Sequence, residues 1–112
     1  MKKIIFIILA SISILSCTNT NREYCRACEN EILKINKELC SSYEFYNQMY
    51  TVYIYWGSSG YETYKLIQIE EKIKELKNKR TYYELEIKKH SKKWEFDSHT
   101  LKSYNDLKEY DK

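Results

Sequence analysis

The chain has 112 residues, enough for one small domain, and its 19 basic and 16 acidic side chains give a formal net charge of +3. Two of the basic residues, Lys2 and Lys3, belong to an N-terminal targeting segment that we expect to be removed, which leaves 17 basic residues against 16 acidic ones. A balance this close to neutral offers no basis for nucleic-acid binding, and we expect no nucleic-acid partner.

Residues 1–16 have the pattern of a bacterial signal peptide. A positive MKK start precedes an uncharged, mostly apolar run at 4–14, which is shorter than the roughly 20 residues that a transmembrane helix needs. The run ends in ILSC at 14–17, which resembles the lipobox cut by lipoprotein signal peptidase. The resemblance implies cleavage before Cys17 and a covalent lipid on its thiol, and two or three acyl chains there anchor a protein stably. The alternative is an ordinary signal peptide cut nearby, with Cys17 unmodified.

Residues 17–21 (CTNTN) contain the lipidation site and a short polar tether, for which we expect no regular structure. The rest of the chain has no proline, and its two glycines lie close together, at 57 and 60. Such a composition predicts long helices joined by one turn, here at 57–60. The sequence therefore predicts a single helical domain over residues 22–112.

Hydrophobic periodicity predicts that these helices form a long antiparallel αα-hairpin, which makes the fold class all-α. On both sides of the turn, mostly apolar residues recur at alternating steps of three and four. The first stripe comprises Cys25, Cys28, Ile32, Ile35, Leu39, Ser42, Tyr46, Met49 and Tyr53. The second comprises Leu66, Ile69, Ile73, Leu76, Arg80, Tyr83, Ile87, His90 and Trp94.

The segment after Trp94 offers a helix break at 96–99, with Asp97 or Ser98 as a new N-cap. A short third helix could then pack back through Leu101, Tyr104 and Leu107; the alternative is one continuous helix with a protruding tail. A hairpin of this size has a thin core, so a homodimer is a natural supplement.

A β-hairpin is the rival interpretation of the residues around the turn. Residues 50–56 (YTVYIYW) favour strands, and a GSSG loop could join them to residues 61–69. Two strands alone are marginally stable in water, and no third candidate strand follows, so helices are favoured.

Three cysteines follow the lipobox, and two of them, Cys25 and Cys28, form a C-x-x-C motif. Redox C-x-x-C motifs occur in βαβ surroundings, which this sequence does not show. The two cysteines and His90 could form a metal site only with a fourth ligand, which is not evident, so we predict no metal. Disulfides are common in exported proteins, but along one straight helix Cys28 and Cys40 lie about 18 Å apart, beyond the roughly 7 Å limit. The alternatives are a disulfide, within or between chains, and buried reduced thiols.

Aromatic residues crowd around the turn, in a chain with 12 tyrosines and 2 tryptophans. Such side chains bring a large contact area to an interface at low entropic cost, although they can also fill the end of a core. The candidate partner-binding residues are Tyr50, Tyr53, Tyr55, Trp56 and Tyr61. No catalytic motif is evident, and we expect neither an enzyme nor a cofactor other than the lipid.

The MKKIIFIILASISILSC start, the polar tether and a proline-free body rich in Lys, Glu, Tyr, Ile and Asn resemble small plasmid-encoded lipoproteins of Borrelia-type spirochaetes. The orf-D family is the specific resemblance. It implies an all-helical protein lipid-anchored to the outer membrane and exposed at the cell surface, but it carries over no binding residues. We therefore expect a non-catalytic lipoprotein that presents a helical hairpin to a protein partner, such as a host protein. The alternatives are a periplasm-facing envelope protein with disulfide-linked cysteines, and a C-x-x-C redox or metal module.

Overall fold

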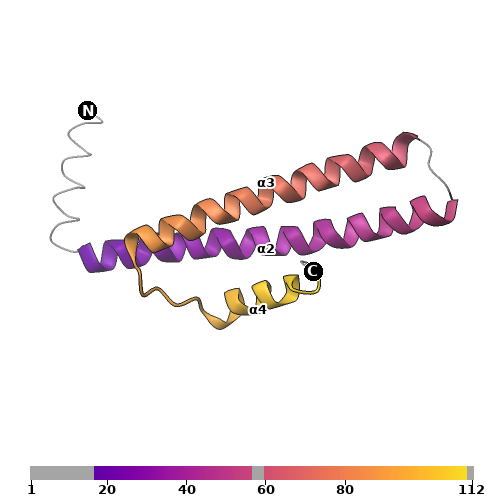
Figure 1. Ribbon diagram of the computed structural model, residues 1–112. Helices are drawn as coiled ribbons and strands as arrows, with labels where there is room; N and C mark the ends of the chain where they lie inside the picture. The colour runs from indigo at the N-terminus through magenta and orange to yellow at the C-terminus, as the bar shows by residue number, and fades with distance from the viewer. Residues whose placement is uncertain (1–16, 57–59, 111–112) are drawn as a thin grey trace, which may run out of the picture.

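The computed structural model describes residues 17–56 and 60–110, which form three helices (Figure 1). Helices α2 (Cys17–Trp56) and α3 (Gly60–His90) pack against each other as a long hairpin, and α4 (Ser98–Leu107) packs against α2. The longest dimension is 63 Å. The predicted all-α hairpin with a short third helix is confirmed.

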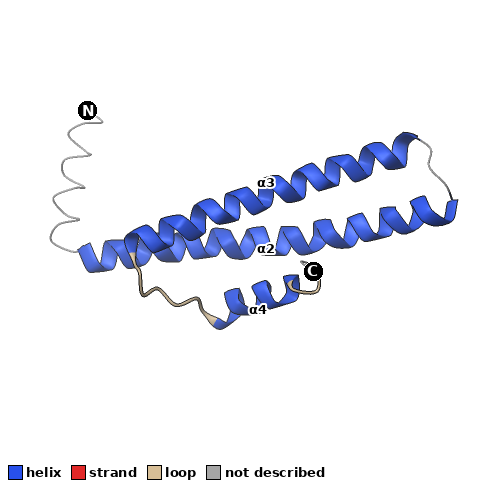
Figure 2. Cartoon of the chain, viewed as in Figure 1, coloured by secondary structure: helices blue, strands red, loops and turns tan. Residues whose placement is uncertain are grey.

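Two helix boundaries at the open end of the hairpin, the start of α2 and the end of α3, differ from the prediction. Residues 17–21, predicted as an irregular tether, form the first turn of α2. Polar residues can extend an existing helix in this way, because adding a residue to a helix that is already formed avoids the free-energy cost of starting a new one. At the other boundary, α3 ends at His90 instead of continuing to Trp94, and a loop leads from it to α4 (Figure 2). In this loop, Trp94 Nε1 donates a hydrogen bond to Glu29 Oε1 of α2 at 2.8 Å.

The β-hairpin alternative is wrong. Residues 50–56 and 61–69 are helical, and the described part of the chain contains no strand. The predicted turn falls between the end of α2 at Trp56 and the start of α3 at Gly60, and residues 57–59 lie outside the described residues.

The core lies in the half of the hairpin that contains the start of α2, the end of α3 and α4, which we call the proximal half. One cluster of buried residues comprises Cys25, Cys28, Ile32 and Ile87. The second comprises Ile35, Leu39, Leu76 and Leu107. Both predicted stripes therefore supply the core here, although His90 is exposed. Toward the other end of the hairpin, Leu66 and Ile69 of the second stripe are also buried, whereas Tyr53 of the first stripe is 37% exposed.

Helix α4 begins at the predicted N-cap, where Asp97 Oδ1 accepts a hydrogen bond from the Thr100 backbone N–H at 3.0 Å. Its predicted apolar face is only partly right, because Leu101 is 56% exposed. The residues of α4 that are buried are Thr100, Ser103 and Leu107.

Two buried polar side chains of α2 explain why α4 turns Thr100 and Ser103, and not Leu101, toward α2. The carboxylate of Glu29, 1% exposed, accepts hydrogen bonds from Trp94 Nε1 at 2.8 Å, Thr100 Oγ1 at 2.7 Å and the Asp97 backbone N–H at 3.0 Å. Buried polar groups are tolerated when they are paired in this way.

The second is Asn36, one heptad further along α2. Its Nδ2 donates to Ser103 Oγ at 2.9 Å, and its Oδ1 accepts from Arg80 Nη1 at 3.1 Å. These bonds link all three helices, so α4 is positioned largely by polar contacts that apolar periodicity does not reveal.

Candidate functional site

The distal segment, residues 45–56 of α2 and 60–69 of α3, is the candidate functional site. Residues 45–56 (FYNQMYTVYIYW) contain no charged side chain, yet none of the side chains described at 45–55 is buried. A helix with apolar residues around its whole circumference is normally enclosed by other elements or by a partner. The α2 part of the distal segment therefore has the composition of an interior and the exposure of a surface, whereas Leu66 and Ile69 of its α3 part are buried.

Three of the predicted partner-binding residues have described side chains, and all three are exposed. Tyr50 is 46% exposed, Tyr53 37% and Tyr55 78%. The alternative of a filled aromatic core end is therefore wrong for these tyrosines. Trp56 lies in α2 and Tyr61 in α3, but their side chains lie outside the described residues. Exposure is a condition for partner binding, and binding itself stays a prediction.

Five further exposed side chains of the distal segment were not among the predicted binding residues. They are Phe45, Val52, Ile54, Tyr64 and Ile67. At about 200 Å² per aromatic side chain, the exposed parts of the distal aromatic residues leave on the order of 500 Å² in contact with water. This area is a sum over residues on several faces of the two helices. The absence of charge at 45–56 is the sequence signal that marks Phe45, Val52 and Ile54.

A row of stacked tyrosines gives part of this surface a fixed shape. The rings of Tyr46 and Tyr50, and those of Tyr50 and Tyr53, lie with centroids 6.2 Å apart and nearly parallel planes. Tyr46 Oη donates to Glu70 Oε1 of α3 at 2.9 Å, and this hydrogen bond to a carboxylate raises the pKa of the phenol. The row is thus tied to α3, and an ordered surface loses less entropy when it binds a partner.

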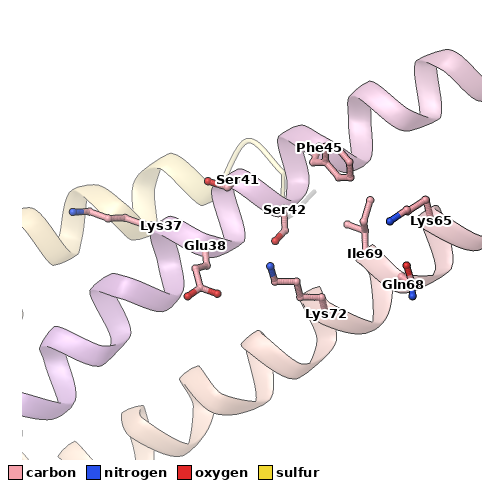
Figure 3. Close-up of a pocket in the computed structure, with 9 residues that line it drawn as sticks. All are labelled: Lys37, Glu38, Ser41, Ser42, Phe45, Lys65, Gln68, Ile69 and Lys72. Atoms are coloured by element: carbon pink, nitrogen blue, oxygen red, sulfur yellow. The ribbon is translucent and has the colours of Figure 1, made fainter. Parts of the chain in front are cut away.

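Two open grooves lie along the seam between α2 and α3. The first, about 640 Å³ in volume, is lined from these two helices alone, and Phe45 and Ile69 project into it (Figure 3). The second, about 680 Å³, begins at Tyr110 beyond the end of α4 and continues past Tyr43 and Asn47. Both grooves lead into the distal segment, so a partner seated there would contact both long helices.

The three thiols predicted as disulfide or thiol sites are free in the described structure. Cys25 and Cys28 are buried, Cys40 is half-buried, and burial raises the pKa of all three thiols. Thiolate formation is therefore disfavoured, which is the reverse of what a redox motif needs. For Cys25 and Cys28 the structure matches the buried-thiol alternative, whereas Cys40 is half-buried.

His90 does not join the C-x-x-C thiols. Its ring lies 4.5 Å from that of Tyr24, and its Nε2 lies 3.7 Å from Glu86 Oε2. Among the described residues, no group of three or more His, Cys, Asp or Glu side chains is arranged to hold a metal ion.

The predicted lipidation site, Cys17, is the first residue of α2, at the end of the hairpin opposite the distal segment. Within residues 17–56 and 60–110, no helix has both the length and the apolar character needed to cross a bilayer. No protein-family model, curated protein or solved structure matches the chain.

Proposed function

We propose that the chain is an exported lipoprotein, cleaved before Cys17 and anchored by lipid at that residue, which presents its distal segment to a protein partner without catalysing a reaction. The observation that carries the proposal is the exposure of an uncharged, aromatic helix end at residues 45–55. The ILSC sequence at 14–17 supports the anchor.

The dimensions of the hairpin suit such a role. Helix α2 has 40 residues, so at 1.5 Å per residue it places the distal residues 45–56 about 40–60 Å from Cys17. The buried clusters and α4 stiffen the half nearer the anchor. A rigid helical spacer with its apolar side chains at the far end would hold them away from the membrane, where a partner can reach them.

We assign the protein to the cell surface of the outer membrane, with a host protein as one class of partner. This assignment rests on the resemblance to Borrelia-type plasmid-encoded lipoproteins, including the orf-D family. The disulfide-linked envelope role has less support, because Cys25 and Cys28 are buried and free and Cys40 is half-buried.

Position-specific photo-crosslinking tests the binding role. A benzophenone amino acid replaces Tyr55, 78% exposed in the distal segment, in the chain expressed by intact cells. The matched control replaces Leu85, which is 61% exposed in the proximal half of α3. We expect protein adducts from position 55 and few from position 85 under the same exposure to light. Equal adducts from both positions, or none from either, would contradict binding at the distal segment.

A further inference from the structure

Helix α2 carries a second heptad-like stripe in addition to the one that faces α3. It follows alternating steps of four and three and comprises Glu29, Leu33, Asn36, Cys40, Tyr43, Asn47, Tyr50 and Ile54. The first five residues of this α4-facing stripe lie beneath α4 and the turn that follows it. Glu29 bonds to Thr100 at 2.7 Å and Asn36 to Ser103 at 2.9 Å. Tyr43 stacks on Tyr110 with ring centroids 5.1 Å apart.

The stripe continues beyond α4, where no other described helix lies on it. Tyr50 is 46% exposed and Ile54 58%, although both keep the spacing of residues that pack against a helix. The groove of about 680 Å³ starts where Tyr110 ends its contact with Tyr43 and runs past Asn47. Within residues 17–56 and 60–110, three helices therefore pack together in the proximal half of the hairpin and two in the distal segment (Figure 1).

We infer that the third helix at this site is the distal part of α2 from a second copy of the chain, packed antiparallel on residues 45–56. In a two-fold symmetric interface the same patch lies on both sides, so a charged patch would repel itself. Residues 45–56 carry no charge, and self-pairing through this segment therefore brings no like charges together.

The position of α4 determines the orientation of the pair. A parallel pair would bring the two α4 helices into the same space, because each lies on the stripe as far as Tyr43. An antiparallel pair instead places the uncovered residues 45–56 of each copy on those of the other, with the two-fold axis beside Tyr50, between residues 50 and 51. The partner helix then continues the line of α4 along the groove, and Ile54 lies opposite Asn47 of the second copy.

The inference rests on the proposed function in one respect, because both take the distal segment as a protein-binding surface. It adds that the partner on the α4-facing stripe is a second copy of the chain. Phe45 and the groove of about 640 Å³ remain uncovered in the pair, open to another protein.

Sedimentation equilibrium of the chain from Cys17 onward, which contains every described helix, tests the inference under reducing conditions. We expect a reversible dimer at protein concentrations up to roughly the millimolar range. Tyr50→Lys and Tyr50→Glu each place like charges at the axis and should weaken it by roughly tenfold or more, whereas a mixture of the two restores a dimer. Tyr55→Lys is the control, because Tyr55 is 78% exposed and lies about 140° around α2 from Tyr50.

Circular dichroism of each variant shows whether its helices are intact. A wild-type chain that stays monomeric, a Tyr55→Lys effect equal to that of Tyr50→Lys, or a mixture that stays monomeric would each overturn the inference. A monomer that instead cosediments with phosphatidylglycerol vesicles would assign the surface to a lipid bilayer and also overturn it. None of these results alters the crosslinking pattern at positions 55 and 85, so a failed pairing is distinguishable from a failed binding role.

Discussion

Replacing Glu29 with alanine should detach α4 from the hairpin. The carboxylate is 1% exposed and accepts three hydrogen bonds, from Trp94 Nε1, the Asp97 backbone N–H and Thr100 Oγ1. A hydrogen bond to a charged group contributes about 1.5–3 kcal/mol, and a buried donor left unpaired loses its solvation as well. Because Thr100 is 1% exposed while Asp97 can reach water, we expect a loss of about 3–5 kcal/mol in total.

Such a loss is a large fraction of the roughly 5–15 kcal/mol that stabilises a domain. Glu29→Gln keeps the shape and one acceptor, but turns an amide N–H₂ toward donors, so it should cost about 1–2 kcal/mol. The control is Glu31→Ala, which removes only a partly exposed pairing with Lys34 at 3.4 Å and should cost less than about 0.5 kcal/mol.

The assay is urea unfolding followed by circular dichroism, together with hydrogen exchange of the α4 amides. In Glu29→Ala we expect lost protection across residues 100–107 while the amides of residues 32–39 stay protected. The reasoning fails if Glu29→Ala is no less stable than Glu31→Ala, or if α4 keeps its protection.

Three further predictions concern the core, the cap and the thiols. Replacing Leu39, which is 0% exposed, with alanine should lower the free energy of unfolding by about 2–5 kcal/mol, as measured in urea. Leu85→Ala, at a 61% exposed position, should lower it by less than about 0.5 kcal/mol. The hydrogen bond from the backbone N–H of Thr100 lowers the pKa of Asp97. The Asp97 carboxylate therefore stabilises the fold fully above the ordinary aspartate pKa of about 4, and this stabilisation is lost as the pH falls through the lowered value. The wild-type melting temperature should therefore fall more on acidification below about pH 4 than that of Asp97→Asn, and equal slopes would contradict this. Iodoacetamide should modify Cys40 before the two buried thiols of the C-x-x-C motif, as mass spectrometry would show; equal rates in the folded protein would mean that the motif is not enclosed.

The hairpin was predictable because each long helix repeats apolar residues on one face over many turns. Ile32 and Leu39 sit on that face and are 0% exposed. The same pattern does not reveal whether another helix covers the apolar face at every turn. Tyr53 lies on the predicted stripe for this reason and is nevertheless 37% exposed. Periodicity identifies a surface suited to packing, and only the fold shows whether the chain covers it.

The docking of α4 could not be predicted from local sequence. Glu29 looks like one of many solvated helix carboxylates, and its burial depends on Thr100, which lies 71 residues away in the chain. The same holds for Asn36 and Ser103, which lie 67 residues apart. The apolar rule selected Leu101 for the buried face of α4, but the hydrogen bonds to α2 turn that residue outward.

The candidate site was predictable in its composition and only partly in its members. The tyrosines near the turn drew attention because aromatic side chains are frequent in interfaces. Ile54 and Ile67 could not be assigned without the structure, since exposed and buried isoleucines look alike in a sequence. The absence of charge across residues 45–56 is the signal that covers most of the set.

Protease treatment of intact cells that express the chain, followed by mass analysis of the fragment left on the membrane, tests most directly whether a lipid at Cys17 anchors an exposed hairpin. We predict that the helical domain is removed and that a short peptide with a diacylglycerol-modified Cys17 stays in the membrane fraction. In the matched variant Cys17→Ser, no lipid-modified peptide should form. An unmodified Cys17 in the wild-type chain would contradict the anchor, and a domain protected until the outer membrane is broken would contradict exposure at the cell surface.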